Sequence, residues 1–155
     1  MRWFPVQYET LYTAETPEQA RNTILRSRIK LISCIYQAQQ TVSGSICMTP
    51  KADQVLFHDS FVPIVTAEIN EKRDGSEIHL RGELHRSIKI LWMLFRAVLA
   101  IFAVAVIVIT ESGTNRISML GLMLLLILWN EGMPRLLSRL RFRSFLREFQ
   151  SECIK

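Results

Sequence analysis

The 155-residue sequence is poor in residues that mark several special protein classes, with 3 cysteines, 6 glycines and 5 prolines. Three cysteines without a Cys-x-x-Cys pair argue against a disulfide-rich secreted domain and against a zinc site. So few glycines and prolines exclude collagen-like and low-complexity chains. Disorder is excluded because 49% of the residues are hydrophobic and only 21% are charged. The chain is therefore a folded protein of about one domain.

Motifs of common catalytic and cofactor sites are also missing. The sequence contains no G-x-S-x-G motif, no G-x-G-x-x-G motif and no phosphate-binding loop. Ser43-Gly44-Ser45 is interpreted as part of a strand. His79 and His85 share one side of a predicted strand, but a metal site needs further ligands that converge there. We therefore predict no catalytic residues, no metal and no cofactor.

Charge is distributed unevenly along the chain. Residues 1–86 carry 10 basic and 10 acidic side chains, whereas residues 87–155 carry 9 basic and 4 acidic ones. The formal net charge of +5 therefore resides in the more apolar half. A basic excess that flanks long apolar runs is typical of membrane proteins. We predict a lipid bilayer, and not nucleic acid, as the partner.

Two apolar runs determine the predicted class. The run Ile88–Ile109 includes 13 consecutive apolar residues, and Arg96 is its one interior charge. The run Ile117–Met133 has 17 residues. About 20 apolar residues cross the hydrocarbon core of a bilayer, and the short connector 111–116 requires antiparallel neighbouring helices. Residues 87–133 are thus predicted to form a transmembrane helical hairpin; the alternative is a hairpin buried in a soluble core.

Basic residues near the ends of these runs indicate the orientation. The connector contains Arg116 alone. The outer ends of the two runs carry many more, namely Arg81, Arg86 and Lys89 before the first and Arg135, Arg139, Arg141, Arg143 and Arg147 after the second. The positive-inside rule then predicts a two-pass protein of the cell membrane with both termini in the cytoplasm.

Hairpin geometry suggests a partner for the interior charge. If the midpoint of the connector lies between Gly113 and Thr114, Arg96 faces Glu131 on the second helix. We predict that these two side chains form an intramembrane pair that fixes the register of the helices. The alternative is that Arg96 extends to the lipid headgroups without a partner.

Residues 134–155 are predicted to form a separate, basic amphipathic C-terminal helix. Its apolar residues form two stripes that point about 180° apart on a helix: Met133, Leu136, Leu137 and Leu140, then Phe142, Phe145, Leu146 and Phe149. Either the helix bends near Arg141, or its halves contact different surroundings. The five arginines Arg135, Arg139, Arg141, Arg143 and Arg147 are predicted to bind anionic lipid headgroups at the membrane surface. The alternative is that the arginines only mark topology and the phenylalanines pack on the α+β domain.

Residues 1–86 are interpreted as a small cytoplasmic α+β domain. A capping box at Thr16–Gln19 predicts a helix from Pro17 to about Lys30. Segment 31–40 fits either helix or strand. Alternation predicts strands over 1–13, 41–48, 55–58, 62–71 and 78–84, the last two joined at Asp74-Gly75. The predicted fold is an about five-stranded, mostly antiparallel sheet with one helix on its face.

Short motifs between Gly44 and Phe102 carry a family resemblance. They are Gly44-Ser45-Ile46, residues 59–63 (DSFVP), Asp74-Gly75 followed by Ile78, and Gly82-Glu83-Leu84 ahead of the first apolar run. This pattern resembles a group of small, uncharacterised bacterial membrane proteins, although Thr66-Ala67 stands where glycine is more usual. In that group a cytoplasmic α+β region precedes two transmembrane helices. The resemblance implies this architecture and no particular activity.

Taken together, these patterns predict an integral membrane protein that anchors a small cytoplasmic interaction or accessory domain. A homo-oligomer and an unidentified membrane partner are both left open. The alternative function is a small membrane enzyme or an oligomeric transport component, with its site at the cytoplasmic boundary of the membrane.

Overall fold

The computed structural model describes residues 6–31, 34–51, 62–109 and 113–154. The chain divides into two compact units. The first contains Met1–His85 together with Leu137–Lys155, and the second contains Arg86–Leu136. Most of the predicted C-terminal segment 134–155 therefore belongs to the same unit as the N-terminal domain.

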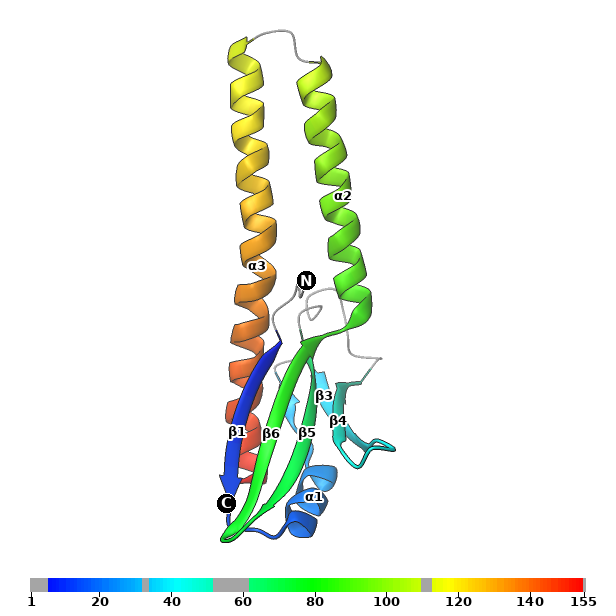
Figure 1. The fold of residues 1–155 in the computed structure, drawn as a ribbon, viewed down its shortest axis with the longest axis vertical. Coiled ribbons are helices and arrows are strands. Elements are labelled where there is room, and N and C mark those ends of the chain that lie inside the picture. Colours follow the sequence, from blue (N-terminus) through cyan, green and yellow to red (C-terminus); the bar gives the residue numbers. More distant parts are fainter. Residues whose placement is uncertain (1–5, 32–33, 52–61, 110–112, 155) are drawn as a thin grey trace. The chain divides into compact units, whose positions relative to one another are not determined.

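The first unit is built on an antiparallel sheet in the order β1-β6-β5-β4-β3-β2 (Figure 1). Its strands are β1 (Gln7–Thr13), β2 (Lys30–Leu31), β3 (Cys34–Gln40), β4 (Ile46–Pro50), β5 (Pro63–Lys72) and β6 (Gly75–Leu84). The coarse α+β prediction is confirmed. The predicted count of about five strands is wrong, because the described residues form six.

The β5–β6 hairpin follows the Asp-Gly signal. Lys72 pairs with Gly75, so Arg73 and Asp74 form a two-residue turn. Gly75 has φ 138°, and a Cβ there would lie 2.0 Å from the carbonyl oxygen of Thr13. Only glycine fits this position, because the neighbouring strand passes so close.

Helix α1 (Pro17–Arg26) begins where the sequence predicts and ends earlier. Thr16 accepts from the backbone N–H of Gln19, and the Gln19 side chain accepts from that of Thr16, as in a capping box. Ser27 has extended backbone angles, and its hydroxyl donates to the carbonyl of Ile24. The residues that follow turn onto the sheet as β2, which ends the helix before Lys30.

Two further strand predictions need correction. Segment 31–40, left open between helix and strand, is strand in its described part. The predicted strand 41–48 is wrong over 41–45, because Gly44 has φ 84° and Thr41 donates to the carbonyl of Ser45 across a tight loop. The hydroxyls of Thr41, Ser43 and Ser45 hydrogen-bond to one another. These local bonds compete with strand pairing, which explains why strand β4 does not begin before Ile46. The predicted strand 55–58 lies outside the described residues.

The predicted separate C-terminal helix is not observed. Helix α3 runs without interruption from Gly113 to Cys153, with Pro134 in its interior. The two apolar stripes have different surroundings, which was one of the two options given by the sequence. Leu136 and Leu140 are exposed, whereas Phe142, Phe145 and Phe149 are buried.

These three phenylalanines belong to the core of the first unit. The core lies on one face of the sheet, and α1 contributes Ile24 to it. The Phe145 ring lies 4.8 Å from the ring of Tyr36 in β3 and 5.8 Å from that of Phe149, measured between centroids. Tyr36 in turn donates to the carbonyl of Pro63 in β5. The C-terminal part of α3 therefore forms, with α1, the layer that covers the sheet.

Gly82 in β6 provides the space for Phe142. A Cβ at Gly82 would lie 2.5 Å from Cδ2 and 2.6 Å from Cε2 of the Phe142 ring. Real Cβ atoms do not approach so closely, so a side chain at position 82 forces the ring to move.

We expect Gly82→Ala to lower the free energy of unfolding by about 1–3 kcal/mol, the usual cost of overpacking a core. In a Phe142→Ala background the same change should cost much less, because the ring that it meets is gone. Urea unfolding of the full chain in mild detergent measures both. Gly121→Ala is the matched control, since a Cβ there meets nothing within 4 Å. Additive effects of Gly82→Ala and Phe142→Ala would contradict this packing.

Candidate functional site

The second unit consists of α2 (Arg86–Ile109) and the first part of α3. Both helices are long and apolar enough to cross a membrane. Of residues 86–106 of α2, only Val106 is buried, and in the most apolar stretch of α3 17% of the residues are buried. The soluble-core alternative requires most side chains here to be buried, and few of the described ones are. Exposed apolar surface of this extent marks a site of contact with a membrane or with another protein.

On each of these helices the less exposed residues form one narrow stripe. The less exposed residues recur every three or four positions on α2 and at intervals of three, seven and four positions on α3, so each set follows one face of its helix, as in a helix–helix seam. They include Trp92, Arg96, Leu99, Ala103 and Val106 on α2, and Leu120, Met123, Asn130 and Pro134 on α3. Arg96 therefore lies within the stripe of α2 and not among its exposed apolar residues.

The structure brings Arg96 and Glu131 together from the two helices. Arg96 Nη2 lies 3.8 Å from Glu131 Oε1. The two side chains are 23% and 46% exposed, respectively. This distance is within ion-pair range and longer than a charge-assisted hydrogen bond, which measures about 2.7–2.9 Å. The guanidinium of Arg96 and the carboxylate of Glu131 therefore attract each other by charge, without a tight hydrogen bond between them.

A second polar group lies beside this pair. Asn130 is 2% exposed, and its Oδ1 has no hydrogen-bond partner among the described residues. Pro134, one turn later, has no N–H to donate to the backbone carbonyl of residue 130. One turn of α3 therefore concentrates acceptor oxygens next to the Glu131 carboxylate. Polar groups at such a place in an apolar helix are costly in lipid and are often functional.

The five predicted membrane-surface arginines lie on α3 and do not converge on one point. Arg135, Arg139, Arg143 and Arg147 are exposed, and Arg141 is half-buried. The exposed Leu136 and Leu140 lie among them. Since the phenylalanine stripe packs on the sheet, the exposed side of this segment presents arginine and leucine together.

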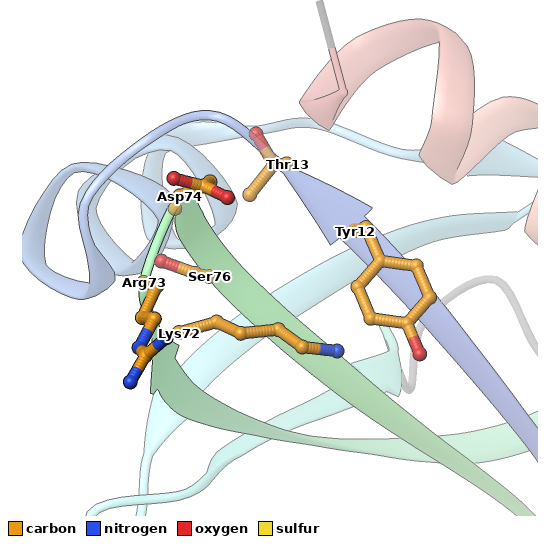
Figure 2. Close-up of a pocket in the computed structure, with 7 residues that line it drawn as sticks. Tyr12, Thr13, Lys72, Arg73, Asp74 and Ser76 are labelled. Carbon is orange, nitrogen blue, oxygen red and sulfur yellow. The ribbon is translucent and has the colours of Figure 1, made fainter.

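The outer face of the sheet carries a polar network near the β5–β6 turn. Figure 2 shows the Lys72 side chain extending towards the ring of Tyr12, and Nζ lies 4.2 Å from the ring centroid. Lys72 Nζ also lies 3.7 Å from Glu77 Oε2. A cavity of about 420 Å³ borders this turn, and Tyr12 and Lys72 are among the residues that line it. Cation–π contact and charge attraction thus hold Lys72 over β1.

Two of the three histidines lie among the described residues, His79 within β6 and His85 after its end. His79 Nδ1 lies 3.1 Å from the Thr10 hydroxyl, and its Nε2 lies 4.0 Å from Glu77 Oε2. His85 is exposed after the end of β6, and His58 lies outside the described residues. Among the residues that the structure describes, no group of three or more His, Cys, Asp or Glu side chains could hold a metal ion.

None of the three cysteines, all of which the structure describes, forms a disulfide. Cys34 and Cys153 are buried, whereas Cys47 in β4 is half-buried. Burial raises the pKa of the Cys47 and Cys153 thiols above the ordinary value. The thiolate fraction at neutral pH is therefore small, and the reactivity of Cys47 should rise with pH.

No protein-family model, curated protein or solved structure matches the chain. Fold and hairpin define its class: an antiparallel α+β unit joined to two helices with the length and apolarity of membrane spans.

Sequence reasoning did not find the Lys72–Tyr12–Glu77 network. The Asp-Gly turn fixes only the β5–β6 register, in which Lys72 pairs with Gly75, whereas Tyr12 pairs with Glu77 between β1 and β6, which are distant in sequence. Pro134 indicates only that the backbone carbonyl of residue 130 lacks its usual helical donor, and no sequence signal reports the unpartnered Oδ1 of Asn130.

A charge-swap series tests whether Arg96 and Glu131 interact. Arg96→Glu and Glu131→Arg should each destabilise the hairpin, because each places like charges together. The double swap should recover about 1 kcal/mol, the usual size of polar coupling between membrane helices. Thermal unfolding in detergent measures the coupling. In the control cycle, Arg86→Glu, ten residues earlier on α2, takes the place of Arg96→Glu. The stability changes of Arg86→Glu and Glu131→Arg should add in their double variant. Additivity in the Arg96 cycle would exclude the pair.

Proposed function

We propose that the chain is an integral membrane protein in which a two-helix hairpin anchors a small cytoplasmic domain that serves as an interaction or accessory module. The observation that carries this proposal is the exposed apolar surface of the second unit. Of residues 86–106 of α2, only Val106 is buried, so water is an unfavourable surrounding for the rest of this apolar stretch. A bilayer satisfies this surface without any further protein.

The two chain segments that make up the first unit support placing the residues before and after the hairpin on the same side of the membrane. Residues up to His85 and residues from Leu137 onward form one compact unit with a shared core. A folded unit of this kind cannot be divided by a bilayer, so the chain crosses the membrane an even number of times. This argument is independent of charge counting.

The choice of side follows from basic residues. The hairpin is followed on α3 by Arg135, Arg139, Arg141, Arg143 and Arg147, and the connector carries Arg116 alone. Positively charged flanks are retained in the cytoplasm. We therefore propose a cell-membrane protein with both termini cytoplasmic.

Native Cys47 provides a direct topology probe, since it is the most accessible of the three thiols. A membrane-impermeant maleimide at mildly alkaline pH should label Cys47 in inverted vesicles and not in intact cells. Ser112→Cys in a Cys47→Ser background should show the opposite pattern. Cys47→Ser alone is the control for labelling of the buried thiols. Labelling of Ser112→Cys only from inverted vesicles would overturn the orientation.

We further propose that the exposed arginines of α3 contact anionic headgroups. A peptide of residues 134–155 is a poor test, because it exposes the phenylalanines that belong to the core. The full chain in nanodiscs is suitable. Replacing Arg139, Arg143 and Arg147 by Gln should remove a stabilisation by anionic lipid of about 1 kcal/mol per charge. Equal thermal stability of the unsubstituted chain in neutral and anionic discs would contradict the contact.

A further inference from the structure

A second cavity of the first unit is surrounded by basic residues. It has a volume of about 530 Å³ and lies between the end of α1, strand β3 and the residue after β4. That volume is in the usual range of small-molecule sites. Its wall includes Arg26, Arg28, Lys51 and Gln37.

The cations of this wall have no partners among the described residues. Arg26, Arg28 and Lys51 are exposed. The ion pairs of the first unit join other residues, namely Lys72 or His79 with Glu77, and Arg81 with Glu83. No described residue of the wall is acidic. Three like charges around one cavity repel each other, and a bound anion relieves that repulsion.

The remaining polar groups of the wall are already engaged. Ser27 donates to the carbonyl of Ile24, and Tyr36 donates to the carbonyl of Pro63. Burial raises the Tyr36 pKa far above its ordinary value, so the phenol stays neutral. The groups that remain for a ligand are the three cations and the Gln37 amide. Every one of them can donate to an oxyanion.

We propose that this cavity is a binding site for a phosphoryl or similar oxyanion group, held by Arg26, Arg28 and Lys51. Planar guanidinium groups match two oxygens of a phosphate at once, and the lysine adds a point charge. The helix C-terminus explains a cation at Arg26, because its carbonyls favour positive charge. It does not explain Arg28 and Lys51, which lie beyond the helix and after β4.

Inorganic pyrophosphate is the probe for this site. Calorimetric titration of the full chain in phosphatidylcholine nanodiscs at physiological salt should show saturable binding. Substituting Gln for Arg26, Arg28 and Lys51 together should weaken it at least about tenfold, as expected from the loss of charged hydrogen bonds. The matched control Arg21→Gln/Arg73→Gln/Arg86→Gln removes equal charge elsewhere and should bind within about twofold of the unsubstituted chain.

The single variant Arg28→Gln keeps the test valid if the triple variant folds poorly, because it changes one exposed side chain and should still weaken binding severalfold. Discs that contain phosphatidic acid distinguish the source of the phosphoryl group. Unchanged pyrophosphate binding there assigns the site to a soluble ligand, and loss of binding assigns it to a lipid headgroup. Absence of pyrophosphate binding in neutral discs would overturn the proposal. So would Arg28→Gln and triple variants that bind pyrophosphate as tightly as the unsubstituted chain does.

Discussion

The packing of three α3 phenylalanines on the sheet is the interaction on which the rest of the structure depends. Phe142, Phe145 and Phe149 complete the core on the face that α1 covers only in part. Burial of each contributes about 1.5–3 kcal/mol. Because these residues follow the hairpin in sequence and their partners precede it, the fold of the first unit requires the chain to return after both apolar helices.

This return constrains what the second unit can be. Both ends of the hairpin join one folded unit. Its apolar surfaces are exposed along α2 and α3. The stripes of lower exposure contain the Arg96–Glu131 contact. A bilayer accommodates the exposed surface, while the seam accommodates polar groups that lipid would not. Under the proposed membrane location, insertion of the hairpin and folding of the first unit are coupled, because α3 belongs to both units.

Features encoded by neighbouring residues could be predicted from the sequence, and most features that need distant partners could not. The approach of Arg96 and Glu131 is an exception, because the short connector limits which residues of the two helices can face each other. The Asp74-Gly75 turn, the start of α1 and both apolar helices are local signals, and the structure has them. The loop at Thr41–Ser45 was missed because hydroxyl hydrogen bonds overrode the alternating pattern. The facing of Phe142 on Gly82 joins residues 60 positions apart, and no local pattern reports it. The basic cavity likewise combines α1, β3 and Lys51, which are distant in sequence.

Native-state hydrogen exchange of the full chain in nanodiscs tests the central claim most directly. If α3 completes the core, amides of residues 142–153 should be protected to the same extent as those of β6, since both open only with the whole unit. Phe145→Ala should lower the protection of β6 and of residues 142–153 together. Fast exchange over 142–153 beside a well-protected β6, or a Phe145→Ala effect confined to α3, would contradict the claim.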